Sequence, residues 1–228
     1  MPVTENALSE KIFKEKPILK KSVLKRSFYE RDTSLVAKDL LGKILITVFC
    51  DVDIQIKNEF CAGMIVEDEA YYGLSDPASH ACNGPTPRSN IMFETPGIAY
   101  VYFCYGNHWL LNAVTEKFGI PGAVLIRAIE PIYGTSIMSY RRSTNRLENL
   151  TNGPGKLTQA FGIKRDFNGR DLTVTESPVF IIDGSGFKNP YLQVSKKEIV
   201  SRPRIGIKNG TDKLLRFYIK DNKFVSKK

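Results

Sequence analysis

Residues 99–114 read AYVYFCYGNHWLLNAV, and this stretch decides the fold. Aromatic and aliphatic residues on both sides of Gly106-Asn107 favour two strands joined by a tight turn. The pattern therefore predicts an antiparallel β-hairpin with Gly106 near its tip. Aromatic rings occupy both faces of this hairpin, and in a protein of basic composition exposed rings suggest stacking on nucleic-acid bases.

The length of the turn decides which side chains of the hairpin share a face. A two-residue turn pairs Tyr102 with Leu111 and puts Asn112 on the opposite face. A three-residue turn over 105–107 places Tyr102 and Asn112 on one face and lifts Tyr105 to the tip. The sequence leaves both turns open.

Stacking energies set how many rings an extruded base needs. Each stacked base is worth about 1–3 kcal/mol, whereas unstacking a base from a duplex costs a few kcal/mol. Two or three rings could therefore hold such a base, and one ring would be marginal. Sheet packing is the alternative explanation for these aromatic residues, and we assign it to Tyr100, Phe103 and Trp109.

Cap and turn residues outline the rest of the chain. Asp32 is suited to cap a short helix that Gly42 ends, and helices are also predicted over 134–146 and from Pro154 onward. Strands are predicted over 43–52, 62–72, 123–129, 174–183 and 214–219. Residues 72–94 form a long Gly- and Pro-rich loop, and loops of that length are usually functional or disordered. We expect one α+β domain over 27–228, preceded by a Lys-rich arm, residues 1–26, with a short helix near 8–13.

The composition points to a polyanionic partner. Of 228 residues, 33 are Lys or Arg and 24 are Asp or Glu, which gives a formal charge of +9 and a pI near 9.3. Nucleic acid is the first candidate and an anionic membrane the second. Four scattered cysteines without a C-x-x-C pair, and only two histidines, argue against a zinc site. With no apolar run long enough to cross a bilayer, we expect a soluble, intracellular protein with reduced thiols.

Three consecutive acids interrupt the apolar strand at 62–72. Alternation along the strand puts Glu67, Glu69 and Tyr71 on one face and Asp68 on the other. A carboxylate beside an aromatic ring, where a strand enters a long loop, is a candidate general base. The alternative is a solvated edge strand whose acids form ion pairs.

A second candidate contact precedes the predicted helix at Pro154. Glycines at a helix start, with Lys156 in the first turn, can bind a phosphate through backbone N–H groups. They can equally be an ordinary loop and helix start, and the spacing is not that of a Walker A motif. Four arginines are further phosphate candidates: Arg141, Arg142, Arg202 and Arg204.

Taken together, these segments resemble the alkyladenine (3-methyladenine) DNA glycosylase family from about Ser27 to near the C-terminus. The landmarks that carry the resemblance are Leu40-Leu41-Gly42-Lys43, Val66-Glu67-Asp68-Glu69-Ala70-Tyr71, Asp76-Pro77-Ala78-Ser79-His80, Thr86-Pro87-Arg88, Met92-Phe93, Tyr100-Val101-Tyr102, Tyr105-Gly106, Arg127-Ala128-Ile129-Glu130-Pro131, Gly153-Pro154-Gly155-Lys156-Leu157 and Leu215-Arg216-Phe217-Tyr218. No single piece is decisive, but their order and spacing are together very specific.

The resemblance implies a monofunctional enzyme of base excision repair. Its substrate would be duplex DNA with an alkylated or deaminated purine, such as 3-methyladenine, hypoxanthine or ethenoadenine, flipped out for hydrolysis of the N-glycosidic bond. The implied fold is one mixed domain with a curved, mainly antiparallel sheet, flanking helices and a protruding hairpin. No metal, cofactor or membrane is implied, and the default state is a monomer. We expect it in the cytoplasm near the nucleoid of a bacterium, or in a eukaryotic nucleus.

The resemblance also assigns roles to residues. Glu69 falls where the family activates the attacking water, Arg127 falls near the flipped nucleotide, and Glu67 on the same face is expected to be structural. Asn112 falls where the family discriminates against the guanine amino group. The residues expected to stack on the base are Tyr71, His80 and Tyr102. The residues expected to contact DNA are Tyr105, which would fill the gap in the duplex, Gly106, Arg88, Lys156 and Arg141.

One residue departs from the family pattern, and three other functions stay open. Tyr72 stands in place of a small aliphatic residue, and we expect it to narrow or redirect the pocket mouth. A bifunctional glycosylase would use the Lys156 amine as nucleophile. A non-catalytic binder of damaged or distorted DNA would keep the hairpin without the chemistry, although Glu69 argues against it. A basic, aromatic-rich chain could also bind RNA.

Overall fold

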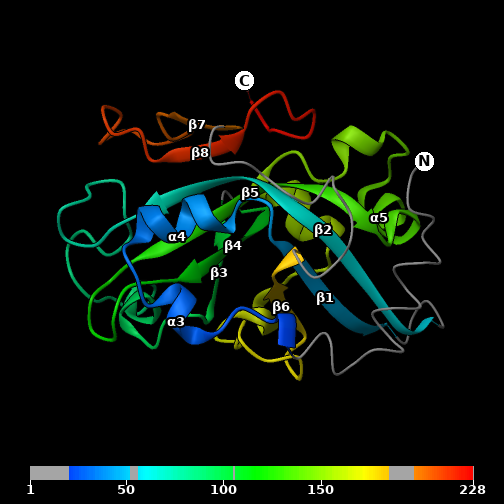
Figure 1. Ribbon diagram of the computed structural model, residues 1–228, viewed down its shortest axis with the longest axis horizontal. Coiled ribbons are helices and arrows are strands. Elements are labelled where there is room, and N and C mark those ends of the chain that lie inside the picture. The colour runs from blue at the N-terminus through cyan, green and yellow to red at the C-terminus, as the bar shows by residue number, and fades with distance from the viewer. Residues whose placement is uncertain (1–20, 52–55, 105, 185–197, 228) are drawn as a thin grey trace.

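The computed structural model describes residues 21–51, 56–104, 106–184 and 198–227. Within these residues a curled sheet forms the centre of the molecule, with short helices packed on it (Figure 1). In chain order the elements are α3 (Arg26–Tyr29), α4 (Thr33–Leu40), β1 (Ile44–Asp51), β2 (Ile56–Tyr71), η2 (Asn90–Phe93), β3 (Ala99–Cys104), β4 (His108–Val114), β5 (Ala123–Tyr133), α5 (Thr135–Arg142), η3 (Leu147–Asn149), α6 (Pro154–Ala160), η4 (Arg165–Phe167), β6 (Val179–Ile182), β7 (Ile199–Arg202) and β8 (Arg216–Ile219).

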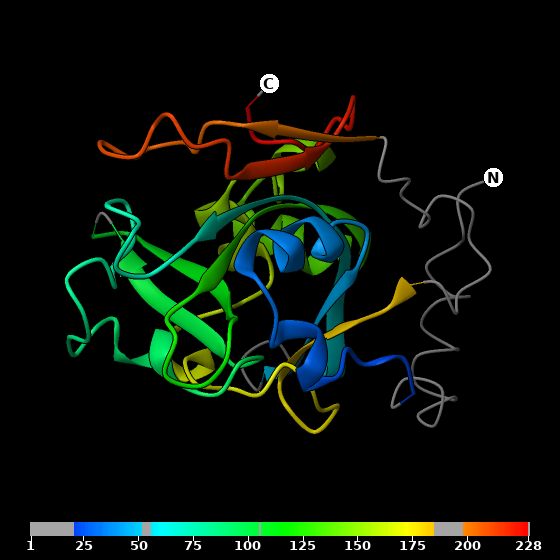
Figure 2. The ribbon, with the colours of Figure 1, turned by 60° about the vertical axis from the view of Figure 1, so that its left-hand side comes forward.

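Strand β2 organises the sheet. The described residues form eight strands, all paired antiparallel, in the order β3-β4-β5-β2-β1-β6, with β8 on β2 and β7 on β8. One edge of β2 pairs with β5, while the other pairs with β1 along 56–64 and with β8 along 67–69. Because two strands share that edge, the sheet divides there, and β7 and β8 lie together along one side of the molecule (Figures 1 and 2). The prediction of an α+β fold with a curved antiparallel sheet is confirmed.

The hairpin β3–β4 has the three-residue turn. Tyr102 pairs with Leu110 and Tyr100 with Asn112, so Tyr102 and Asn112 share a face. The turn spans 105–107, and the Asn107 N–H donates to the Cys104 carbonyl at 3.3 Å. Tyr105, which the three-residue turn would lift to the tip, lies outside the described residues.

Helix α4 follows from its cap residues. The Asp32 carboxylate accepts from the N–H groups of Ser34 and Leu35, both at 3.0 Å. Gly42, just past the helix, has a φ of +85°, a conformation that glycine adopts without strain. The inner face of α4, with Val36 fully buried, packs on β2 and β5, as Figure 1 shows. The predicted start and end of this helix are therefore confirmed.

The remaining predictions differ in outcome. Helix α6 begins at Pro154 as predicted, whereas β7 was not predicted. The predicted arm does not stay separate up to residue 26, because Val23 and Leu24 are buried and the Leu24 N–H donates to the Ile181 carbonyl in β6 at 2.9 Å. The helix expected near 8–13 lies outside the described residues.

The described residues form two hydrophobic clusters, and the smaller one positions the long loop at 72–94. The larger one fills the space around the sheet, and its largest fully buried side chains include Tyr29, Phe60, Phe161, Phe217 and Phe224. A smaller cluster joins the loop to the hairpin and to β5, and consists of Ala81, Met92, Tyr100, Val114 and Ala123. The loop is thereby anchored over the side of the hairpin that carries Tyr100 and Tyr102.

Candidate active site

The acids of β2 lie in the interior of the protein. Glu67, Asp68 and Glu69 have no exposed surface, and β2 is paired on both edges at these positions. The alternative of a solvated edge strand is therefore wrong. The predicted alternation of side chains along β2 is found. Glu67 and Glu69 both contact Arg127, whereas the Asp68 carboxyl on the other face has no hydrogen-bond partner among the described residues.

Three donors from different parts of the chain hold Glu69. The Ile205 N–H donates to Oε1 at 2.7 Å, and the Tyr71 hydroxyl donates to Oε2 at 2.8 Å. A guanidinium nitrogen of Arg127 lies 3.2 Å from Oε2. Burial raises the pKa of Glu69 above its usual range, although Arg127 and the two hydrogen bonds oppose this shift. The carboxylate is thus fixed in place and more basic than a surface glutamate.

Arg127 bridges the two glutamates. Its Nε donates to Glu67 Oε1 at 3.1 Å, while its Nη1 faces Glu69. Burial disfavours the charged guanidinium, but the neighbouring carboxylates of Glu69 and Glu67 outweigh that cost and raise the pKa of Arg127. Glu67 accepts hydrogen bonds from donors on β5, β8 and the C-terminal tail, and its expected structural role stays a prediction.

A cavity of about 320 Å³ opens in front of this cluster. This volume is within the range of small-molecule sites. Its lining includes Tyr71, Arg127 and Ile205, which are the three partners of Glu69, whereas Glu69 itself lies directly behind them. The predicted base-binding residues Tyr71, His80, Tyr102 and Asn112 all line this cavity, as does the predicted DNA contact Arg88.

Aromatic rings form one wall of the cavity. The His80 ring meets the Tyr102 ring edge to face, with centroids 4.7 Å apart, and His80 Nδ1 is hydrogen-bonded to the Tyr100 hydroxyl at 2.8 Å. Burial, helped by Arg88, lowers the pKa of His80, so its imidazole is neutral near pH 7. Tyr100 was expected only to pack in the sheet core. That expectation is wrong, because Tyr100 lines the cavity and fixes the His80 ring.

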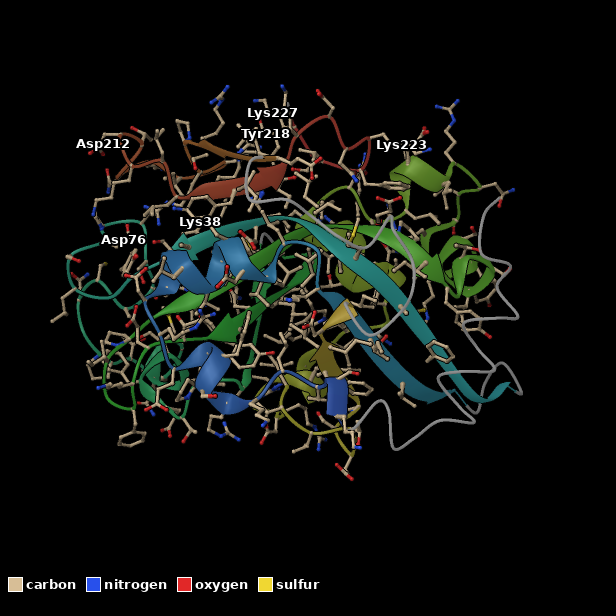
Figure 3. All side chains as sticks on the ribbon, in the orientation of Figure 1. Lys38, Asp76, Asp212, Tyr218, Lys223 and Lys227 are labelled. Carbon is tan, nitrogen blue, oxygen red and sulfur yellow. The ribbon has the colours of Figure 1, made fainter. Side chains whose placement is uncertain are left out.

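A buried ion pair supports Tyr71 from behind. The Arg204 guanidinium lies 4.6 Å from the centre of the Tyr71 ring and makes two hydrogen bonds to Asp76, at 2.6 and 2.7 Å. Arg204 and Asp76 side chains have no exposed surface, so a surface phosphate contact is the wrong role for Arg204. Figure 3 shows Asp76 in the loops beyond the end of β2. Sequence reasoning missed this pair, because 128 residues separate its members.

Two residues fix the hairpin side of the cavity. Asn112 is buried, and its amide donates to the Tyr100 carbonyl across the hairpin at 3.0 Å. Arg88 is exposed, donates to the Phe103 carbonyl at 2.7 Å, and lies 5.1 Å from the centre of the Tyr102 ring. The cavity therefore has a cation at its rim and a fixed amide in its wall.

Comparison with known proteins assigns a family to this arrangement. The family model for methylpurine-DNA glycosylase matches residues 27–223. The chain belongs to the methylpurine-DNA glycosylase family. It is therefore a DNA glycosylase, an enzyme of DNA repair.

Relatives from distant microbes share most of the chain. Proteins of Prosthecochloris aestuarii, Carboxydothermus hydrogenoformans and Methanoculleus marisnigri, each provisionally named a 3-methyladenine DNA glycosylase, are 45%, 43% and 44% identical to it over 201 residues. Each alignment covers 88% of this chain, and 89%, 97% and 97% of the respective relative. The resemblance inferred from sequence motifs is confirmed.

The other predicted DNA contacts of this glycosylase lie away from the cavity lining. Gly106 is exposed at the hairpin turn, with a φ of +73°. Lys156 donates to Asn152 Oδ1 at 2.8 Å, and Arg141 donates to the Ala160 carbonyl at 3.2 Å. Their contact with DNA stays a prediction, and the intramolecular bond of Arg141 gives it a structural role as well.

Tyr72 does not shape the pocket mouth. Its hydroxyl donates to Asp32 Oδ2 at 2.9 Å and accepts from the Ser34 N–H at 3.2 Å, so the ring is tied to the start of α4. It is not part of the cavity lining among the described residues. The expectation that Tyr72 narrows or redirects the mouth is wrong, because Tyr72 points to the opposite face of β2 from Tyr71.

The described part of the glycosylase has neither a cluster of metal ligands nor a membrane-spanning helix. It holds no group of three or more His, Cys, Asp or Glu side chains placed to bind a metal ion. None of its helices is long and apolar enough to cross a membrane.

Proposed function

We propose that this glycosylase hydrolyses the N-glycosidic bond of a damaged purine that has been flipped out of duplex DNA, with Glu69 as the general base. One observation carries the proposal. A fully buried carboxylate sits behind a cavity, and its three partners, Tyr71, Arg127 and Ile205, all line that cavity. A carboxylate made more basic by burial, beside a site for a small aromatic ligand, is suited to accept a proton from water.

The reaction needs little else from the protein. Water attacks the sugar carbon while the bond to the purine breaks, the purine leaves with the bonding electrons, and the proton of the water passes to Glu69. A methylated purine already carries a positive charge, so it leaves as a neutral base without a proton donor. Electron-rich rings favour such a cation, and the lining supplies Tyr71 and Tyr102 together with the neutral His80.

The same geometry favours water over an amine as the nucleophile. Lys156 is bonded to Asn152 and is not among the cavity-lining residues. A monofunctional enzyme is therefore proposed, and borohydride should trap no covalent adduct between the protein and a lesion-containing duplex. Asn112, held in the wall by the Tyr100 carbonyl, is the candidate residue for rejecting the guanine amino group.

The test compares Glu69→Gln with the unaltered chain on methylated duplex DNA and on duplexes that carry one hypoxanthine or one ethenoadenine. Loss of the general base should lower the rate of purine release by about 10²–10⁴-fold, while the variant still binds the same duplex. Glu148→Gln is the matched control, because Glu148 is exposed and pairs with the exposed Lys223.

Other outcomes would change the assignment. If Glu69→Gln releases purine as fast as the unaltered chain, the general base is another residue, with Glu67 the first candidate. Duplex binding without release by the unaltered chain would favour a non-catalytic binder of damaged or distorted DNA.

A further inference from the structure

The C-terminal tail, residues 224–227, reaches back to the buried glutamates. The Ser226 N–H donates to Glu67 Oε2 at 2.6 Å, and the Ser226 hydroxyl donates to Oε1 at 2.9 Å. Phe224 and Val225 are buried and anchor the tail beside the sheet. The family match ends at residue 223, so these contacts belong to a segment beyond the matched residues.

Arg216 of β8 fastens the tail to the same carboxylate. One of its guanidinium nitrogens donates both to Glu67 Oε1 at 3.0 Å and to the Lys227 carbonyl at 2.8 Å. The guanidinium also lies 4.9 Å from the centre of the Tyr218 ring. Figure 3 shows Lys227 and Tyr218 close together on the β8 side of the molecule.

These contacts continue through Arg127 to Glu69. Glu67 Oε1 accepts from Arg127 Nε at 3.1 Å, and the other arm of Arg127 lies 3.2 Å from Glu69 Oε2. The guanidinium is shared between two carboxylates that repel one another. Donors on Glu67 therefore determine how much of the Arg127 charge is left to stabilise Glu69.

We propose that the tail is a positioning segment for Glu69, acting through Glu67 and Arg127. The proposal rests on the proposed role of Glu69 as general base. Within the described residues neither Ser226 nor Arg216 lines the cavity, and neither side chain hydrogen-bonds Glu69, although the Arg216 backbone pairs opposite Glu69 in the sheet. They are therefore positioning residues rather than catalytic ones.

Removal of the Ser226 hydroxyl has a definite electrostatic sign. Glu67 would draw Arg127 closer, and Glu69 would lose part of its compensation, so its pKa would rise further. The other charged and titratable groups that act on this cluster are Asp68 on the opposite face of β2, Tyr71, Tyr102, and Arg204 with its partner Asp76. None of them contacts Ser226, so the substitution isolates the path through Glu67.

The experiment measures single-turnover release of methylated purines as a function of pH. Methylated duplex DNA is chosen because its cationic bases need no proton donor, so the acidic side of the profile reports the general base. The variants are Ser226→Ala and Ser226→Thr, which keeps the hydroxyl, with Lys220→Ala as a control at an exposed site at the end of β8. Thermal unfolding and duplex binding are measured on the same samples.

Ser226→Ala should shift the acidic limb of the pH–rate profile to higher pH, by roughly half a pH unit to one pH unit. Its rate should approach that of the unaltered chain at high pH, with unchanged binding to DNA. Ser226→Thr and Lys220→Ala should follow the unaltered profile. A purely structural role for Ser226 would lower the rate equally at every pH.

If the unaltered chain is active and Ser226→Ala has the same pH–rate profile, the positioning role of the tail is overturned, while the proposed function stands. A uniform loss of rate across pH would overturn the positioning role as well. Failure of the unaltered chain to release any purine would overturn the proposed function and, with it, this inference. Arg216→Met, which removes both hydrogen bonds and the charge, should shift the acidic limb in the same direction, and it tests the path through Glu67 independently of Ser226.

Discussion

The buried acids on the two faces of β2 differ in their hydrogen bonding. On the cavity face, Glu67 and Glu69 share Arg127, and every carboxylate oxygen accepts a hydrogen bond. On the helix face, Asp68 is equally buried, yet neither of its oxygens has a hydrogen-bond partner among the described residues. The strand therefore carries two hydrogen-bonded carboxylates that share a cation on one face, and one acid without such partners on the other.

The hydrogen-bonded carboxylates of Glu67 and Glu69 therefore differ from the carboxyl of Asp68, for which the neutral form is favoured. Desolvation, reinforced by Glu67 and Glu69, raises the pKa of Asp68 well above its usual range, so the neutral acid is the stable form inside the fold. Its cross-strand neighbours, Ile126 and Phe217, are apolar, and the Lys38 amine of α4 lies over the Phe217 ring instead of the Asp68 carboxyl. Burial alone thus does not mark a functional acid, and the difference lies in the donors around it.

Removal of Arg127 would disrupt the cavity face of β2 and should have the largest effect. Arg127→Gln leaves two glutamates buried side by side without their shared cation, which should lower the free energy of unfolding by about 3–5 kcal/mol near pH 7. Part of this loss should return on acidification, because protonation of the glutamates relieves their repulsion. Urea unfolding across pH measures both effects.

The matched control for that experiment is Arg202→Gln. Arg202 is exposed and, within the described part of the chain, bonds only the neighbouring Ser201 carbonyl, so its substitution should change stability by less than about 0.5 kcal/mol. Equal losses for the two variants would show that Arg127 is an ordinary charge rather than the bridge between Glu67 and Glu69.

Asp68→Asn should stabilise the helix face of β2, by an amount that depends on pH. The folded chain keeps the Asp68 proton that the unfolded chain releases near pH 4, so the contribution of Asp68 to stability is present below that pH and is lost as the pH rises. Asparagine has no proton to lose. The gain should be near zero in acid and should grow by up to about 1.4 kcal/mol per pH unit above pH 4 until the folded-state pKa is passed.

Unfolding by urea between pH 4 and pH 8 checks this slope. Asp212→Asn serves as the control, since Asp212 is exposed in the loop before β8, where Figure 3 labels it. Its stability difference should stay within about 0.5 kcal/mol at every pH. A gain for Asp68→Asn that does not vary with pH would mean that Asp68 is already ionised in the folded protein.

The sequence predicted the local features of both faces and missed the long-range ones. The Asp32 cap, the Gly42 stop and the alternation of acids along β2 depend on neighbouring residues, and all three are found in the structure. Part of the cavity lining was also expected, through motifs shared with the family, whereas Tyr100 and Ile205 were not assigned to it.

The missed features join segments far apart in the chain. Ser226 meets Glu67 across 159 residues, and no local pattern records which strands bring such partners together. For the same reason the acids of β2 could be read as a solvated edge, because their burial depends on β8, a strand nearly 150 residues later. Local propensity fixes which way a side chain points, whereas tertiary pairing decides what it meets.

The smallest effect expected distinguishes the two tyrosines at the end of β2. Tyr71 lies on the cavity face with its hydroxyl on Glu69, and Tyr72 lies on the helix face with its hydroxyl on Asp32. Tyr72→Phe should cost about 1 kcal/mol of stability and leave purine release unchanged, because Asp32 still caps α4 through Ser34 and Leu35. Tyr71→Phe should instead slow release roughly tenfold, since Glu69 loses a donor within the site. Thermal unfolding and single-turnover release on the same pair of variants measure both quantities, and a slower reaction for Tyr72→Phe would mean that the helix face also contributes to the chemistry.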